Sequence, residues 1–193
     1  VDKPKQFIDL MGMGESMIQS TFRRFERICP RENIIIVTTK VHEQQVRRQI
    51  PDLHDYQVLC EPFRRNTAPC VAYAAAVVAA INPNANIIVT PSDHAIFGSM
   101  DFERNILDAI HMADQHDWIL TLGAKPVNPN IKYGYIQLRE AQVRHIQFME
   151  TLQYFLIRKL ARLVRGERIF YISLVTHLDS LSLRFSKYSS VII

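Results

Sequence analysis

Two short polar segments directly follow apolar, β-branched stretches of this sequence. The first is Pro91-Ser92-Asp93-His94, which comes after the run 86–90. A carboxylate placed there can hold Mg²⁺, because Mg²⁺ takes oxygen ligands and keeps several of its waters. Asp93 can also simply cap the next turn, and His94 suits a structural role better than a catalytic one. The residues alone leave a metal site and a helix or turn cap open for Asp93.

The second polar segment is Glu61 to Pro69, Glu-Pro-Phe-Arg-Arg-Asn-Thr-Ala-Pro, which follows the run 57–60. It sets two guanidinium groups, an amide and a hydroxyl just before an expected helix. Such groups can bind the base edge, ribose or phosphates of a nucleotide. A helix cap flanked by solvated arginines accounts for the same residues. Spacing alone does not decide between these two interpretations.

Two segments near the N-terminus have the chemistry to bind an anion. Lys3-Pro4-Lys5 offers two ammonium groups beside a stiff proline, and lysine pairs with phosphate as a point charge. Spacing alone favours an exposed basic segment there. Gly12-Met13-Gly14 precedes an expected helix and can present backbone N–H groups to an anion. It lacks the longer glycine patterns of nucleotide loops, so an ordinary tight turn explains it better.

Several classes of site have no support in the sequence. The histidines show no HExxH motif and no pair four residues apart, so a zinc site is not expected. No G-x-S-x-G motif occurs, and no Cys/His spacing suggests a covalent nucleophile. The three cysteines form no CxxC pair, which favours a reducing, cytoplasmic setting. No apolar run of about 18 residues predicts a membrane span, and the first residues lack the layout of a signal peptide.

The elements that must position these residues alternate between strand and helix. Strands are expected at 33–39, 57–60, 86–90 and 118–122, and helices at 16–28, 42–50, 67–81 and 102–115. Ser16 and Gln19 form a capping box, and Thr67 is the expected N-cap of the third helix. Such alternation predicts βαβ units and a mostly parallel sheet. Ligands of such sheets bind beyond the carboxyl ends of the strands, where Glu61 and Asp93 lie.

The last quarter of the chain differs in composition from the rest. Residues 1–138 hold 14 basic and 15 acidic side chains, whereas residues 139–193 hold 9 and 4. Apolar and basic residues alternate with helical spacing over 152–165, which predicts a basic amphipathic helix. Such a helix can lie on an anionic membrane or on nucleic acid, but packing against the domain explains it better. A final strand is expected at 170–175.

Five motifs together resemble one known family. They are Lys3-Pro4-Lys5-Gln6-Phe7, the Glu-Pro-x-x-Arg-Asn-Thr-Ala-Pro segment at 61–69, Pro91-Ser92-Asp93-His94, the Thr-Leu-Gly-x-Lys-Pro segment at 121–126 and Tyr133-Gly134-Tyr135-Ile136. They occur in the order found in the mannose-1-phosphate guanylyltransferases, also called GDP-mannose pyrophosphorylases. The resemblance covers residues 3–138, and residues 139–193 match the family poorly.

The resemblance implies a Rossmann-like nucleotidyltransferase fold of the α/β class, with a mixed, mostly parallel sheet flanked by helices. Residues 1–138 would form the catalytic domain, and residues 139–193 would continue it. The implied enzyme makes GDP-mannose and pyrophosphate from GTP and α-D-mannose 1-phosphate. Mg²⁺ is the implied cofactor, with no nucleic-acid or membrane partner, and the family leaves room for a homo-oligomer.

The resemblance also assigns roles to individual residues. Lys5 would pair with phosphate oxygens, and Asp93 would hold Mg²⁺; these two are the expected catalytic residues. Gly134 and Glu150 would bind the sugar, Gly134 because a side chain there would block its approach. The expected guanosine pocket consists of Glu61, Arg65, Asn66 and Thr67.

The sequence departs from the family pattern at three places. The family's glycine-rich phosphate loop should precede Lys3, and the sequence as given starts after it. Ile131-Lys132 stands where the family has a Thr-Gly pair, and Phe148-Met149-Glu150 keeps only the Phe and Glu of an F-x-E-K-P motif. These departures leave two alternatives to the guanylyltransferase interpretation: a related transferase that uses another nucleotide or sugar, and a non-catalytic nucleotide-binding fragment.

Overall fold

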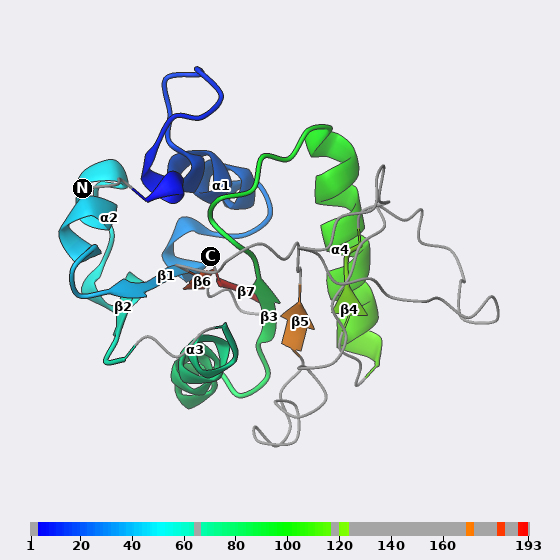
Figure 1. Ribbon diagram of the computed structural model, residues 1–193. Coiled ribbons are helices and arrows are strands. Elements are labelled where there is room, and N and C mark those ends of the chain that lie inside the picture. Colours follow the sequence, from blue (N-terminus) through cyan, green and yellow to red (C-terminus); the bar gives the residue numbers. More distant parts are fainter. Residues whose placement is uncertain are drawn as a thin grey trace, which may run out of the picture.

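The computed structural model describes residues 4–63, 67–116 and 120–123, together with the backbone of three short strands at 169–171, 181–183 and 189–192. Its centre is a sheet with helices on both faces (Figure 1). The strands up to residue 123 are β1 (Ile34–Thr39), β2 (Val58–Glu61), β3 (Asn86–Val89) and β4 (Leu120–Thr121). The later strands are β5 (Ile169–Tyr171), β6 (Leu181–Leu183) and β7 (Ser189–Ile192).

The sheet is mixed and mostly parallel, as the sequence predicted. Its order is β2-β1-β7-β3-β5-β4, and every pair along this path is parallel. Strand β6 lies off the path and pairs antiparallel with β1. Residues Ile34 to Val37 of β1 are fully buried, because a strand covered on both faces can be apolar throughout. The predicted α/β class is therefore confirmed.

The helices divide into two layers that pack on opposite faces of this sheet. Helices α1 (Met17–Glu26), α2 (Glu43–Gln49) and α4 (Ser99–Gln115) pack on the face that carries Ile34, Ile36 and Ile88. Helix α3 (Thr67–Ile81) packs on the other face, against Ile35, Val37 and Val89. Figure 1 shows α1 and α3 on either side of the strands. The core is thus split by the sheet into two apolar clusters.

Most predicted elements lie within a few residues of the observed ones. Helix α3 spans the predicted residues 67–81. Thr67 was predicted to be the N-cap, but it is the first residue of the helix itself. Helix α4 begins three residues earlier than predicted, because Gly98 adopts a left-handed conformation (φ 77°) that starts the helix at Ser99. The predicted helix at 152–165 lies outside the described residues, and the predicted last strand is represented by β5.

The start of α1 is tied to two neighbouring segments. Ser16 is its N-cap, and the Gln19 side chain accepts a hydrogen bond from the Ser16 backbone N–H at 2.9 Å. The Ser16 hydroxyl donates to Gln49 Oε1 at 2.7 Å, and Gln49 Nε2 donates to the carbonyl of Phe7 at 3.0 Å. Phe7 ends the short helix η1 (Lys5–Phe7). These bonds join η1, α1 and α2 around one cap.

Replacing this cap residue should cost measurable stability. We expect Ser16→Ala to lower the free energy of unfolding by about 1–2 kcal/mol, because it removes a cap and leaves the part-buried Gln49 Oε1 without its donor. Urea titration of the variant measures this loss. Ser20→Ala, a matched change four residues further along α1, should shift the midpoint much less. Equal shifts would show that the hydroxyl of Ser16 has no special role.

Candidate functional site

The predicted site residues that the structure describes gather at one edge of the sheet. Glu61 ends β2, and Asp93 follows β3 in a turn formed by Pro91–His94, here named the Asp93 turn. Both strands run parallel to β1 and β7, which lie between them, so both ends face the same way. Glu61 is level with Thr39 of β1, whereas Val89 is level with Ile35, so the two strand ends are offset by four residues along the sheet. Together with three strand spacings of about 4.8 Å, this offset puts Glu61 and Val89 roughly 20 Å apart. That span suits an elongated ligand better than a single ion.

Lys5 lies on η1, and a ring of this helix contacts the segment that follows β1. The Phe7 ring lies 5.6 Å from the ring of His42, which comes shortly after the carboxyl end of β1. Phe7 is buried, whereas Lys5 is exposed. The buried aromatic ring therefore anchors η1 and leaves Lys5 exposed to solvent. An exposed cation can meet an anionic ligand.

Glu61 and Thr67 flank the short loop that carries the predicted nucleotide-binding residues. Cys70, in the first turns of α3, is buried and lies against the Glu61 side chain. Burial raises the pKa of the Cys70 thiol well above its usual range, and the Glu61 carboxylate raises it further. The thiol therefore stays protonated and hydrogen-bonds with Glu61. This contact joins the end of β2 to the start of α3.

The Asp93 turn packs against helix α1. The buried Thr21 hydroxyl donates to the carbonyl of Ser92 at 3.5 Å. His94 Nε2 lies 3.8 Å from an oxygen of Asp93, and both side chains are mostly buried. Burial, helped by the positive charge of Arg24, lowers the pKa of His94 to about 4. His94 is thus neutral at physiological pH, so it does not form an ion pair with the Asp93 carboxylate.

The donor set of this turn fits Mg²⁺ bound together with a phosphate ligand. The described residues contain no group of three or more His, Cys, Asp or Glu side chains placed to hold a metal. A structural zinc site needs about four such ligands. Mg²⁺ often takes only one or two carboxylates and completes its shell with water and phosphate oxygens. Asp93, partly exposed at the strand ends, can supply one such carboxylate.

The buried neutral His94 predicts a pH-dependent stability. The unfolded chain takes up a proton at this side chain below about pH 6.5, whereas the folded chain does not until about pH 4. Stability that is complete above pH 6.5 is therefore lost as the pH falls towards 4, by up to about 3 kcal/mol. Urea titrations between pH 7.5 and 4.5, without divalent cations, should show that His94→Gln removes this part of the slope. His116→Gln, at an exposed position, should keep it; equal slopes in all three proteins would contradict the prediction.

Backbone N–H groups of the Gly12–Gly14 segment, which could have bound an external anion, are bonded to a side chain of the protein. The Asp9 carboxylate accepts hydrogen bonds from the backbone N–H groups of Met13 (3.1 Å) and Gly14 (2.7 Å). These bonds lower the pKa of Asp9, the one from Gly14 most. Gly12 and Gly14 both have positive φ angles, which a tight turn of this kind requires. The turn interpretation is confirmed.

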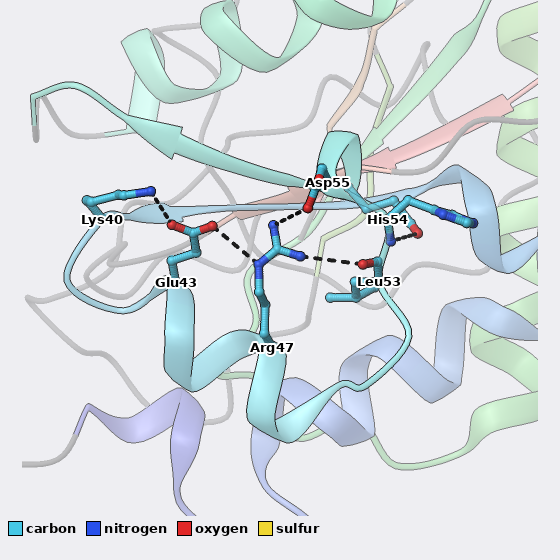
Figure 2. A network of polar contacts seen from close by, with 7 residues as sticks. Lys40, Glu43, Arg47, Leu53, His54 and Asp55 are labelled. Carbon is cyan, nitrogen blue, oxygen red and sulfur yellow. Dashed lines mark hydrogen bonds and ion pairs between the residues drawn. The ribbon is translucent and has the colours of Figure 1, made fainter.

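A second polar cluster on α2 is structural (Figure 2). Lys40 Nζ lies 2.6 Å from Glu43, and Glu43 also binds Arg47 Nε at 3.2 Å. Arg47 further pairs with Asp55 at 3.2 Å and donates to the carbonyl of Leu53. Hydrogen bonds from Lys40 and Arg47 lower the pKa of Glu43. Because these charges neutralise one another, the cluster fixes α2 to the segments on either side and offers no excess charge to a ligand.

Four predicted site residues lie outside the described residues: Arg65, Asn66, Gly134 and Glu150. The binding roles assigned to all eight site residues stay predictions. Sequence reasoning missed Thr21, which contacts the Asp93 turn, and Arg24, which lies one helical turn further along α1. Their spacing of three residues, beside the apolar positions of α1, was the available signal. No helix among the described residues is both long and apolar enough to cross a membrane.

Comparisons with known proteins agree with this fold. The model of the nucleotidyl transferase family matches residues 1–151. Mannose-1-phosphate guanylyltransferase from Escherichia coli is 33% identical over 138 residues, which are 69% of this chain and 29% of that protein. The alginate biosynthesis protein AlgA of Pseudomonas aeruginosa is 30% identical over 161 residues, or 76% and 32% of the two chains. The chain thus spans about a third or less of these relatives.

A solved structure is similar over a comparable share of the chain. The crystal structure of mannose-6-phosphate isomerase from Helicobacter pylori superposes with a TM-score of 0.57 at 28% sequence identity, over 69% of this chain and 51% of that one. The family model covers well over half of the present sequence. On these grounds the chain belongs to the nucleotidyl transferase family.

Proposed function

We propose that this chain is the nucleotide-binding part of an Mg²⁺-dependent mannose-1-phosphate guanylyltransferase. The observation that carries the proposal is the position of Asp93 beyond β3, at the same sheet edge as Glu61. The names of relatives at about one-third identity support GTP and mannose 1-phosphate as substrates. Family membership alone supports only the coarser class, transfer of a nucleotidyl group.

The proposed reaction needs placement and charge neutralisation. A phosphate oxygen of mannose 1-phosphate forms a bond to the α-phosphorus of GTP, while the bond from that phosphorus to the bridging oxygen breaks. The products are GDP-mannose and pyrophosphate, and no covalent enzyme intermediate is required. Holding two anions in line can lower the barrier by roughly 7–11 kcal/mol. The exposed Lys5 ammonium would offset phosphate charge during this transfer.

The other described residues have distinct proposed tasks. The Glu61 carboxylate, oriented by the Cys70 thiol, would accept hydrogen bonds from N–H groups of the guanine edge. Thr67 would contribute its hydroxyl from the first turn of α3. Asp93 would hold Mg²⁺, which when bound would neutralise charge on the phosphates and on the leaving pyrophosphate. Arg65, Asn66, Gly134 and Glu150 complete the proposed substrate contacts.

The direct test is pyrophosphate release by the purified full-length protein. GTP, ATP, UTP and dTTP should each be paired with mannose 1-phosphate and with glucose 1-phosphate, in the presence of Mg²⁺. We expect the highest kcat/KM with GTP and mannose 1-phosphate. A preference for another nucleotide or sugar would instead identify a related sugar-1-phosphate transferase. Binding of GDP-mannose without turnover of any pair would support a non-catalytic nucleotide-binding protein.

A further inference from the structure

A partly buried cation, Arg24, lies close to the Asp93 turn and has no role in the proposed reaction. Arg24 lies on α1, one turn beyond Thr21, whose hydroxyl contacts the carbonyl of Ser92. The central guanidinium carbon of Arg24 lies 5.7 Å from the ring centre of Phe102 on α4. Its charge also acts on His94 in the turn. The guanidinium therefore lies where α1, α4 and the Asp93 turn meet.

The electrostatics of this position are unusual for a structural arginine. Burial lowers the pKa of Arg24 to about 10, so the group is still charged at neutral pH. Its Nη1 atom is buried and has no hydrogen-bond acceptor among the described residues. Glu15 is the carboxylate whose charge acts on Arg24, but Glu15 lies 2.8 Å from the neighbouring Arg23. Burying an N–H donor of a charged group without an acceptor costs free energy, unless a further group pairs with it.

We infer that Arg24 is a positioning residue, which holds the Asp93 turn in the conformation that binds the metal–nucleotide complex. The inference rests on the function proposed above. The guanidinium lies over the Phe102 ring of α4, one helical turn from the Thr21 hydroxyl that contacts the Asp93 turn, so it supports the turn from the side of α1. Groups that support a metal ligand in this way typically change metal affinity by about 10- to 100-fold.

Three variants of the full-length protein test the inference. Arg24→Met keeps much of the length of the side chain but removes its charge. Arg24→Lys keeps the charge but loses the planar group that stacks on Phe102. Arg23→Met is the matched control, because Arg23 is adjacent and exposed and pairs with the same Glu15. Urea midpoints establish that each variant is folded.

Two readouts are compared: the Mg²⁺ concentration for half-maximal pyrophosphate release, and binding of Mn²⁺–GTP followed by electron paramagnetic resonance. We expect Arg24→Met to raise the half-maximal Mg²⁺ concentration by at least about 10-fold and to weaken Mn²⁺–GTP binding similarly. Arg24→Lys should give a smaller rise, and Arg23→Met should stay within about twofold of the wild type.

The results separate the inference from the proposed function. A folded Arg24→Met protein with wild-type Mg²⁺ dependence and wild-type Mn²⁺–GTP binding would overturn the inference. If Arg24→Met does not fold, an unchanged Arg24→Lys protein would overturn it instead. A wild-type protein that binds Mn²⁺–GTP without turnover would refute the proposed function alone, and the binding comparison would still decide the role of Arg24. A wild type that does not bind Mn²⁺–GTP would refute both.

Discussion

Asp93→Asn should reduce kcat/KM for pyrophosphate release by at least about 100-fold while leaving the fold intact. The substitution removes a negative charge and a strong oxygen ligand but almost no volume. A loss of this size corresponds to about 2.7 kcal/mol of transition-state stabilisation, which is within the several kcal/mol that a metal ion supplies in phosphoryl chemistry. Steady-state kinetics at saturating Mg²⁺ measure the effect, and urea titration measures the stability.

The same substitution elsewhere provides the control for this experiment. Asp108 is exposed on α4, away from the strand ends, so Asp108→Asn should keep wild-type kinetics. If the turnover of Asp93→Asn stays within a few-fold of the wild type, Asp93 only caps its turn. Excess Mg²⁺ should recover little of the lost rate, because the missing ligand is part of the protein and is not replaced by water at equal cost.

Phe25→Ala should lower the free energy of unfolding by about 3–5 kcal/mol. Phe25 on α1 is fully buried, and its ring lies 5.9 Å from that of Phe102 in an edge-on arrangement. Truncation removes this aromatic contact and leaves a cavity between α1, α4 and the sheet. Such a loss is a large share of the roughly 5–15 kcal/mol that stabilises a typical domain.

Phe97→Ala is the matched control, since the Phe97 side chain is 73% exposed. Its urea midpoint should remain close to that of the wild type, because an exposed ring loses little on truncation. A Phe25→Ala protein no less stable than Phe97→Ala would mean that α1 and α4 do not share one core. Because Phe102 also contacts Arg24, Phe25→Ala should in addition weaken the support of the Asp93 turn.

The fold was largely predictable because its signals are local. The β-branched residues 34–37 predicted a buried strand, and the alanine-rich stretch after residue 67 predicted α3 with its observed ends. The parallel arrangement followed from the alternation of these elements. The start of α4 was predicted less well, since it depends on the left-handed conformation of Gly98 and not on a helix-favouring side chain.

The surroundings of the site were less predictable because they depend on contacts between distant segments. Nothing local to Cys70 indicates that its thiol meets Glu61, and the spacing of Thr21 and Arg24 indicates only that they share a face of α1, not that this face meets the Asp93 turn. The predicted strands placed Glu61 and Asp93 beyond strand ends, which the structure confirms. Which buried side chains orient them could be seen only once α1 and α3 were placed on opposite faces of the sheet.

This division of the core has a thermodynamic consequence for ligand binding. Glu61 is held through α3 and its cluster, whereas the Asp93 turn is held through α1 and α4 in the other cluster. Each half can therefore open locally at its own free-energy cost, without the other. A ligand that contacts both strand ends stabilises only the state in which both halves are closed. A ligand bound at the end of β2 thus favours an ordered Asp93 turn at the end of β3, and the reverse holds as well. The sheet that separates the two apolar clusters is therefore also the element through which a bound ligand couples their stabilities.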